Sequence, residues 1–456
     1  MEIPIKKNEE YVVEIIDNGY EGEGIAKIDN YTIFVPNALK GEKVRILILK
    51  TTSSHAFGKI VEILEKSDIR VEPDCNSYRR CGGCNLRHIK YEKTLDLKRE
   101  VVQNLINKNL NTKIKVEQTI GMDDPFFYRN KAQYPVGMGK NGKATFGVFA
   151  NRTHDIIEFD ECKIQTKISS EIAKVIIDFV NKNNISVYDE NTGMGLLRHI
   201  VIKYGMKTDE VMCVLVLRKE KFKGEEELIK ILLKKFPNIK TIIKNINTKN
   251  TNVIFGNKNI VVYGSGYIQD KLGDYIFNIS ANSFYQVNPV QTEKLYNLAI
   301  EGANLNKNDV VFDLYCGIGT IGIFASKHVK KVYGIEIVEQ AIEDAKQNAK
   351  INNIENIDFT AGDVEEIFEK KINEDKITPN VVFIDPPRRG LDENTVKNLL
   401  NLKPNKIVYI SCNPATLVRD LKSFEEKYKI EKITPVDLFP YTSHVENVTL
   451  LSLNNC

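Results

Sequence analysis

From about Val310 to its end, this chain alternates short apolar runs with helix-forming stretches, and this alternation constrains the fold more than any other feature. The runs include Val310–Cys316, Lys331–Glu336, Asn380–Asp385 and Lys406–Ile410. Each is short, rich in β-branched residues and bounded by polar residues, as expected of strands buried on both faces. Strands separated by helices predict a parallel, doubly wound α/β sheet.

A glycine-rich loop, residues 317–322, follows the first of these strands. Backbone without side chains can approach a ligand closely there. The next strand ends in Glu336, whose carboxylate suits the two hydroxyls of a ribose. Both features fit a dinucleotide as well as S-adenosylmethionine, so spacing alone leaves the cofactor open. The Pro386-Pro387 pair after Asp385 favours S-adenosylmethionine, because it forms a rigid loop over cofactor and target base that a dehydrogenase does not require.

Cys412 stands between an apolar run and the start of another helix, in the segment Ile410–Pro414. Asn413 can cap that helix and Pro414 suits its first turn. The thiol is then expected at the carboxyl end of a parallel strand, where open α/β sheets bind ligands and where a positive helix end favours a thiolate. An isolated cysteine in this setting is more often a small buried thiol, so its interpretation depends on its neighbours.

The last two predicted strands, Lys432–Leu438 and Val445–Leu451, are joined by a short segment and are therefore antiparallel. If the first strand ends at the ligand-binding rim, the second begins there, and Glu446 and Cys412 face one pocket. A thiolate, a carboxylate and S-adenosylmethionine suggest methylation of carbon 5 of uracil. A thiolate adds at carbon 6 and generates an enolate that takes the methyl group, and a base then removes the proton from carbon 5. The pair predicts Cys412 as nucleophile and Glu446 as base.

The length and charge of the chain limit the remaining interpretations. A chain of 456 residues needs two or three domains. The net charge of +3 means that any nucleic-acid site is a local patch. The start of the chain has no apolar signal core, and no apolar run reaches the roughly 18 residues of a membrane span. These features predict a cytoplasmic protein without a membrane partner.

Four cysteines form a pattern typical of a metal site. Cys75, Cys81 and Cys84 are close in sequence, Gly82 and Gly83 let their loop wrap tightly, and Cys162 is the candidate for a fourth ligand. Without an export signal, such cysteines are expected as thiols and ligands rather than disulfides. Four thiolates suit zinc or a [4Fe-4S] cluster, and the spacing does not choose between them.

Several segments are candidates for RNA contact. Between Cys75 and Arg99, seven basic residues stand against two acids, an excess consistent with phosphate contact or with a solvated face. Phe126–Lys131 and Leu197–His199 mix aromatic and basic residues, as suits single-stranded RNA, although such aromatics also occur in cores. The seven basic residues are Arg79, Arg80, Arg87, Lys90, Lys93, Lys98 and Arg99.

Residues 5–64 alternate short β-rich runs with turns, which predicts a small barrel. Gly19, Gly22 and Gly24 supply a flexible turn in it before Ile25–Lys27. This region resembles a TRAM domain, the OB-like barrel attached to many RNA-modifying enzymes.

Three motifs, Asp385–Leu391, Ser411–Asp420 and Asp437–Glu446, closely resemble those of the RNA uracil-5-methyltransferases, particularly the TRAM-bearing 23S ribosomal RNA enzymes. The resemblance covers essentially the whole chain. It implies that Cys412 is the nucleophile and Glu446 the proton acceptor. It also implies a [4Fe-4S] cluster on the four cysteines, and S-adenosylmethionine contacts at four further positions, which are Gln286, Tyr315, Glu336 and Asp385.

The expected architecture therefore has three parts. Residues 4–64 form the TRAM barrel, residues 65–280 a central α+β domain that carries the metal cluster and binds RNA, and residues 281–456 a seven-stranded, Rossmann-like methyltransferase domain. A helix at about residues 92–120 is expected to pack with the catalytic domain. The expected partner is 23S ribosomal RNA, in a single-stranded or loop region with a flipped uridine, bound by a monomer. The alternatives are the same reaction on transfer RNA and a non-catalytic iron–sulfur RNA-binding protein.

Overall fold

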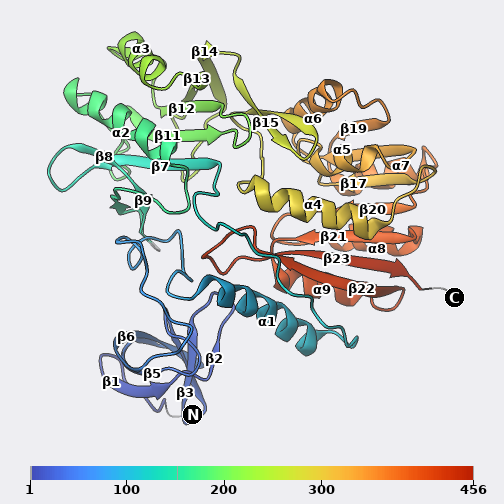
Figure 1. Ribbon diagram of the computed structural model, residues 1–456, viewed down its shortest axis with the longest axis horizontal. Coiled ribbons are helices and arrows are strands. Elements are labelled where there is room, and N and C mark those ends of the chain that lie inside the picture. The colour runs from blue at the N-terminus through green and yellow to red at the C-terminus, as the bar shows by residue number, and fades with distance from the viewer. Residues whose placement is uncertain (1–2, 151–152, 455–456) are drawn as a thin grey trace.

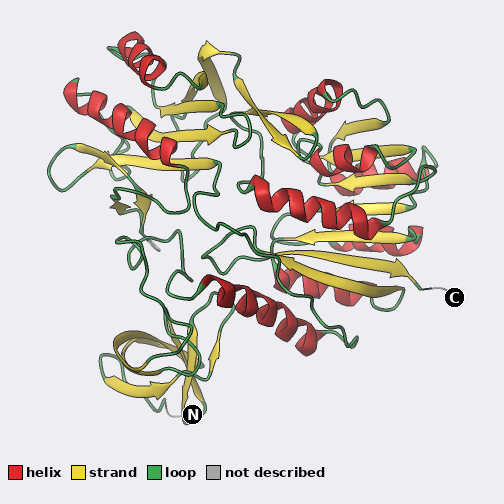
Figure 2. Cartoon of the chain, in the orientation of Figure 1, coloured by secondary structure: helices red, strands yellow, loops and turns green. Residues whose placement is uncertain are grey.

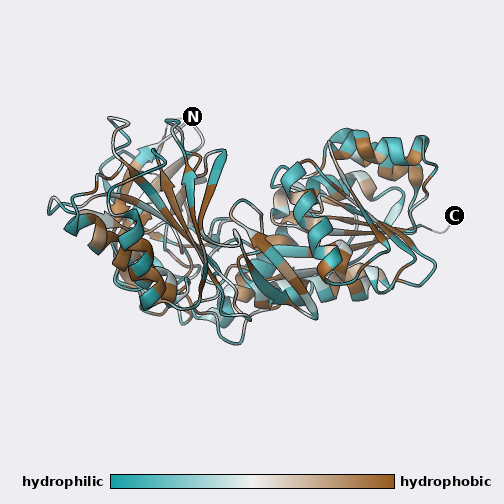
Figure 3. Ribbon diagram, turned by 90° about the horizontal axis from the view of Figure 1, so that it is seen from above, coloured by the Kyte–Doolittle hydropathy of each residue, from teal (hydrophilic) through white to brown (hydrophobic). Residues whose placement is uncertain are grey.

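The computed structural model describes residues 3–150 and 153–454. Figure 1 shows three parts: the blue N-terminal strands at the lower left, a green central sheet above them, and the orange and red C-terminal sheet at the right. In the view of Figure 3 the C-terminal sheet forms one lobe and the other two parts form a second lobe. No helix within the described ranges has the length and apolar character needed to cross a membrane.

The N-terminal part is a curved sheet of six short strands in the order β1-β5-β6-β4-β3-β2. Its interior forms because alternate residues point inward, as Val44, Ile46 and Ile48 do along one strand. Gly58 lies against Ile46, where a side chain would crowd the core. The strands are β1 (Glu10–Glu14), β2 (Asp17–Asn18), β3 (Gly24–Ile28), β4 (Tyr31–Val35), β5 (Lys43–Thr51) and β6 (His55–Glu65).

A long helix, α1 (Tyr91–Asn109), follows the cysteine-containing segment. Its buried residues recur every fourth position, from Thr94 through Lys98 to Val102 and Ile106, and therefore share one face. This face packs against α9 (Pro414–Phe424) and β22 (Tyr428–Val436) of the C-terminal part. Residues 110–120 continue as extended chain, so the helix is shorter than the expected span.

The central sheet has six strands in the order β14-β13-β12-β11-β7-β8 and is mixed, since β12 and β13 are parallel and the other pairs antiparallel. Helices α2 (Lys167–Lys182) and α3 (Glu225–Lys235) pack against one of its faces. Two small ribbons, β9/β10 and β15/β16, flank it. The strands are β7 (Lys131–Met138), β8 (Ala144–Phe146), β9 (Val148–Phe149), β10 (Ile156–Ile157), β11 (Leu197–Tyr204), β12 (Val211–Leu217), β13 (Ile239–Ile246), β14 (Lys258–Gly264), β15 (Tyr267–Leu272) and β16 (Tyr275–Ser280).

The C-terminal sheet has seven strands in the order β19-β18-β17-β20-β21-β23-β22, which confirms the predicted doubly wound α/β fold. Helices α4, α5 and α6 share the hydrophobic core on one face, and α1, α7, α8 and α9 that on the other (Figure 2). The remaining strands are β17 (Val310–Leu314), β18 (Lys331–Glu336), β19 (Ile357–Ala361), β20 (Val381–Ile384), β21 (Lys406–Ser411) and β23 (Glu446–Leu453). The remaining helices are α4 (Pro289–Ala303), α5 (Thr320–Ser326), α6 (Glu339–Ile351), α7 (Val364–Asn373) and α8 (Glu393–Leu402).

The pattern of hydropathy explains this layering. Figure 3 shows mostly brown strands between helices whose turns carry both teal and brown, as expected when strands are covered on both faces and helices on one. Strand β21 is fully apolar in its middle, where Ile407, Val408, Tyr409 and Ile410 are all completely buried. The sheet therefore holds the loops at its carboxyl edge on a rigid base.

Candidate active site

Cys412 lies between the carboxyl end of β21 and the first turn of α9, as the sequence predicts. Asn413 caps that helix, because its side-chain Oδ1 accepts a hydrogen bond of 3.1 Å from the Ala415 amide. The Asn413 side-chain amide also donates to the carbonyl of Arg388 at 3.1 Å. The loop that carries Cys412 is thereby attached to the loop that follows β20.

Glu446 is the first residue of β23, and its position follows from the strand register. Strands β21 and β23 are antiparallel, with Ser411 paired to Asn447. One step further along the same register, Cys412 stands opposite Glu446, and opposed residues of antiparallel strands share one face. The predicted antiparallel arrangement of the last two strands is also confirmed, since Val436 of β22 pairs with Glu446. The two predicted catalytic residues therefore meet at one edge of the sheet.

Burial, with a smaller contribution from neighbouring charges, favours the protonated form of both groups in the resting pocket. Burial raises the pKa of Glu446 to about 8, the charge of Asp385 adds to the increase, and Arg388 opposes it. Burial likewise raises the pKa of Cys412 to about 12, with Glu446 and Asp385 adding and Arg388 opposing. The helix end expected to favour a thiolate is present, but burial and the two carboxylates outweigh it.

A cavity next to these residues brings together three of the four predicted cofactor contacts. Gln286, Tyr315 and Asp385 line it with Gly317 of the glycine loop. Burial raises the pKa of Asp385 to about 7. The hydroxyl of Tyr315 donates to Asp392 at 3.5 Å. The backbone of Tyr315 has a φ of 65°, a left-handed conformation that places this residue in a tight turn.

Glu336, the fourth predicted contact, holds the base of the glycine loop. Its carboxylate accepts hydrogen bonds from the amides of Gly317 at 3.2 Å and Val338 at 3.0 Å. Asp313 supports the other end of the loop, where Oδ2 accepts a bond of 2.7 Å from the Gly322 amide. Loop amides held in this way, beside a carboxylate at the end of β18, suit the ribose of a nucleoside ligand.

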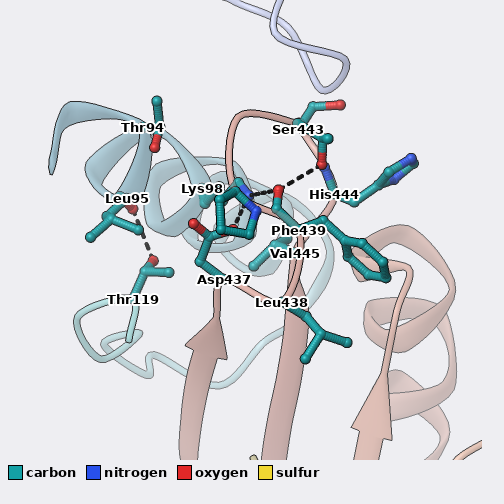
Figure 4. A network of polar contacts seen from close by, with 12 residues as sticks. Thr94, Leu95, Lys98, Thr119, Asp437, Leu438, Phe439, Ser443, His444 and Val445 are labelled. Carbon is teal, nitrogen blue, oxygen red and sulfur yellow. Dashed lines mark hydrogen bonds and ion pairs between the residues drawn. The ribbon is translucent and has the colours of Figure 1, made fainter. Parts of the chain in front are cut away.

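A buried polar network that no sequence motif indicated fixes the chain just before Glu446 (Figure 4). Lys98 of α1 donates to Asp437 Oδ1 at 2.5 Å and to the Phe439 carbonyl at 3.2 Å. The hydroxyl of Tyr91 donates to Asp437 Oδ2 at 2.7 Å. Because each charged group is buried with partners, the network holds the loop between β22 and β23 in one position.

The four predicted metal ligands share one neighbourhood. Burial raises the pKa of Cys84 to about 12, and negative charge on Cys75, Cys81 or Cys162 adds to the increase. Backbone amides already point at two sulfurs, from Gly83 to Cys81 at 3.2 Å and from Ile164 and Gln165 to Cys162. Across residues 3–150 and 153–454, however, no three His, Cys, Asp or Glu side chains are close enough to hold a metal ion.

Several residues expected to contact RNA instead make internal contacts. Arg87 is buried, pairs with Asp74 and lies over the Tyr441 ring at 4.2 Å. Arg198 is also buried and donates to the backbone carbonyls of residues 247, 249 and 251. Lys98 belongs to the network described above. Four members of the basic segment are exposed, namely Arg79, Arg80, Lys90 and Lys93, and Lys93 also pairs with Asp96 at 2.9 Å.

Comparison with known proteins agrees with this geometry. A family model described as tRNA (Uracil-5-)-methyltransferase matches residues 90–454, and one described as TRAM domain matches residues 4–61. An uncharacterised RNA methyltransferase of Clostridium acetobutylicum is 48% identical over 453 residues, 98% of each chain. One from Staphylococcus aureus is 44% identical over 450 residues, 98% of this chain and 99% of its own.

Among solved structures, the tRNA (uracil-54, C5)-methyltransferase of Pyrococcus abyssi in complex with S-adenosyl-L-homocysteine is similar throughout. The TM-score is 0.76 at 26% identity, and the match covers 97% of this chain and 100% of the other.

Proposed function

This chain belongs to the S-adenosylmethionine-dependent RNA uracil-5-methyltransferase family, and we propose that it methylates carbon 5 of a specific uridine in 23S ribosomal RNA through a covalent adduct with Cys412. The observation that carries this proposal is the register of the C-terminal sheet. It sets Cys412 opposite Glu446, beside a cavity lined by Gln286 and Asp385.

In the proposed mechanism Cys412 is the nucleophile. Its proton passes to solvent as the thiolate forms, a step that the positive charge of Arg388 favours. The sulfur bonds to carbon 6 of a flipped uracil, and the electron pair of the carbon 5–carbon 6 double bond moves to carbon 5 and the carbonyl oxygen. Carbon 5 is then nucleophilic enough to take a methyl group, which uracil alone is not.

Glu446 completes the reaction as a base. After methylation, carbon 5 carries both the new methyl group and its original proton. The Glu446 carboxylate accepts that proton, the double bond forms again, and the carbon–sulfur bond breaks to release Cys412 as a thiolate. The base must be ionised for this step, so the raised pKa of Glu446 has to fall once the pocket is filled.

The cofactor cavity has the chemistry that S-adenosylmethionine requires. When bound, S-adenosylmethionine supplies an electrophilic methyl group on a positively charged sulfur. We assign Glu336 to the ribose, and Gln286, Tyr315 and Asp385 to the remainder of the molecule, which agrees with the lining of the cavity. The buried carboxyl of Asp385 gains a partner of opposite charge on binding, and this lowers its pKa.

We further assign Cys75, Cys81, Cys84 and Cys162 to a [4Fe-4S] cluster. Four thiols with amide donors at two of the sulfurs have the chemistry of such a cluster, and binding it requires the sulfurs to move closer together, because no three of them are close enough to hold a metal in the described residues. Its role is structural, since the loop that carries Cys84 continues into residues that contact the catalytic hairpin. Iron and sulfide analysis of anaerobically purified protein tests this assignment; a protein that binds zinc instead, or no metal, contradicts it.

Transfer RNA is the second candidate substrate. The Pyrococcus abyssi enzyme acts on uracil 54 of tRNA according to its description, and its match covers 97% of this chain, the barrel included. The barrel therefore does not separate the two substrates. Support for 23S ribosomal RNA comes from the resemblance of the three catalytic motifs. We expect a monomer that acts in the cytoplasm, where both RNAs occur.

Mapping 5-methyluridine in the RNA of a deletion strain tests the function directly. Loss of one or two sites in 23S ribosomal RNA, restored by the wild-type gene, is the expected result. Loss confined to transfer RNA replaces the proposed substrate by the second candidate. No loss in either RNA supports the non-catalytic alternative, an iron–sulfur RNA-binding protein.

A further inference from the structure

Tyr20 of the N-terminal barrel reaches the catalytic pocket, although it is almost 400 residues from Cys412 in sequence. Its hydroxyl lies 3.4 Å from Oδ1 of Asn413, the residue next to Cys412, at a separation of 393 residues. The Tyr20 ring is 40% exposed. The bond to Asn413 is at the long limit, and Oδ1 already accepts from the Ala415 amide, so the contact is weak and leaves the ring free for other contacts.

The loop that carries Tyr20 is held in place by one side chain. The Asn85 amide donates to the Glu21 carbonyl at 2.6 Å and to Ser443 Oγ at 3.0 Å, and Asn85 Oδ1 accepts from the Ser443 amide at 2.8 Å. Gly22 lies so close to Leu86 that an added Cβ would approach it to 2.4 Å, and its φ of +84° is one that glycine prefers. The barrel loop, the cysteine segment and the catalytic hairpin therefore meet at Asn85.

The surroundings of Tyr20 are the reacting groups of the pocket. Burial raises the pKa of the Tyr20 hydroxyl above its ordinary value, Cys412, Glu21 and Glu446 add to the increase, and Arg388 opposes it. The phenol therefore stays protonated at neutral pH. What it offers is a partly exposed aromatic ring beside a thiol, a carboxyl group and a guanidinium.

We propose that the Tyr20 ring forms the barrel-side wall of the uridine pocket and packs against the flipped nucleotide. A base that flips out of the RNA loses its stacking contacts on both faces, and an aromatic ring of the protein can replace those on one face. The barrel thus contributes a residue to the catalytic pocket itself, besides any contact with RNA elsewhere. This inference rests on the proposed reaction at Cys412.

The test measures steady-state methylation of RNA from the deletion strain by wild-type protein and variants. Tyr20→Ala is expected to raise KM for RNA about tenfold, the effect of losing one base–aromatic contact. Tyr20→Phe keeps the ring and is expected to stay within about twofold of wild type, because the lost hydroxyl bond is weak. Affinity for S-adenosylmethionine and the thermal midpoint stay unchanged in both variants. The matched control is Tyr263→Ala on β14, a tyrosine of similar exposure at 42% on the edge strand of the central sheet, and it is expected to behave as wild type.

A second variant tests how Tyr20 is positioned. Asn85→Ala releases the loop without removing the ring, and it is expected to raise KM for RNA as well. If Asn85 acts through Tyr20, the double variant Tyr20→Ala/Asn85→Ala raises KM for RNA no further than Tyr20→Ala alone does. Independent, multiplying effects contradict that part of the inference.

The results separate this inference from the proposed function. A wild-type protein that methylates no RNA overturns the proposed reaction. If the wild-type protein is active and Tyr20→Ala has normal kinetics, the inference about Tyr20 is wrong but the proposed function stands. If Tyr20→Phe is as impaired as Tyr20→Ala, the hydroxyl matters rather than the ring, and the inference is wrong. If Tyr20→Ala binds S-adenosylmethionine more weakly, Tyr20 has a structural role, and the inference is also wrong.

Discussion

Lys98 and Asp437 form an ion pair inside the protein, with 2.5 Å between Nζ and Oδ1 and side chains only 1% and 0% exposed. The two residues are 339 positions apart in sequence. One comes from α1 and the other follows β22, directly before the loop that leads to Glu446. The pair therefore joins the first helix of the chain to the edge of the catalytic pocket.

Removing one member of this pair is expected to destabilise the protein strongly. Lys98→Met leaves the Asp437 carboxylate buried without its cation, a change that costs about 3–5 kcal/mol of the free energy of unfolding. The measurement is denaturant unfolding of Lys98→Met and Asp437→Leu, each alone and combined. The double variant is expected to be more stable than the sum of the single losses predicts, and simple additivity would show that the groups do not interact.

Cys412→Ala is expected to stop methylation. Loss of a covalent nucleophile lowers the rate by more than about 10⁴-fold, as in other enzymes whose nucleophile has been removed. Because the cofactor cavity is lined by other residues, calorimetric titration should give an unchanged affinity for S-adenosylmethionine. Appreciable methylation by this variant excludes the covalent route.

Glu446→Gln is expected to stop the reaction one step later. The variant keeps Cys412 but cannot accept the proton from carbon 5, so turnover falls by roughly 10²–10⁴-fold and the methylated adduct accumulates. A protein–RNA band that survives denaturing electrophoresis is the readout. The double variant Cys412→Ala/Glu446→Gln is the control and should give no such band; a Glu446→Gln protein that turns over normally removes Glu446 from the role of base.

Binding of S-adenosylmethionine is expected to release protons. The pKa values of Asp385, about 7, and Glu446, about 8, are raised in the resting pocket, so both carboxyls carry protons for part of the time at neutral pH. A positively charged ligand favours their ionised forms and lowers both pKa values, so affinity rises with pH across this range.

Calorimetry in two buffers of different ionisation enthalpy measures the number of protons released. S-adenosylhomocysteine has the same shape without the positive charge and is expected to release fewer, and Glu446→Gln is expected to reduce the release for S-adenosylmethionine. Equal proton release by the two ligands would show that the sulfonium charge is not felt by these carboxyls.

Local structure followed the sequence pattern closely. The expected strand Lys331–Glu336 has the same bounds in the structure. The cap at Asn413 is also as expected, because capping and strand length depend on neighbouring residues alone. The meeting of Cys412 and Glu446 could be foreseen because a short connection dictates antiparallel strands.

The properties that the sequence did not reveal depend on residues far apart in the chain. Lys98 and Arg87 stand in a basic segment that suggests phosphate contact, but each has an internal carboxylate partner. Tyr20 lies in a glycine-rich turn of the barrel, and nothing local indicates that the turn meets Asn413. The protonation of Cys412 follows from burial and from two carboxylates on other strands, which no local motif displays.

The high pKa of Cys412 also affects how the protein withstands its surroundings. Peroxides and electrophilic metabolites react with thiolates and hardly with thiols, so a cysteine whose pKa is about 12 is oxidised and alkylated slowly. A low pKa would make the nucleophile ready at all times, but it would also expose it to damage between encounters with RNA. A sulfur that stays protonated until the pocket fills is therefore protected from such damage.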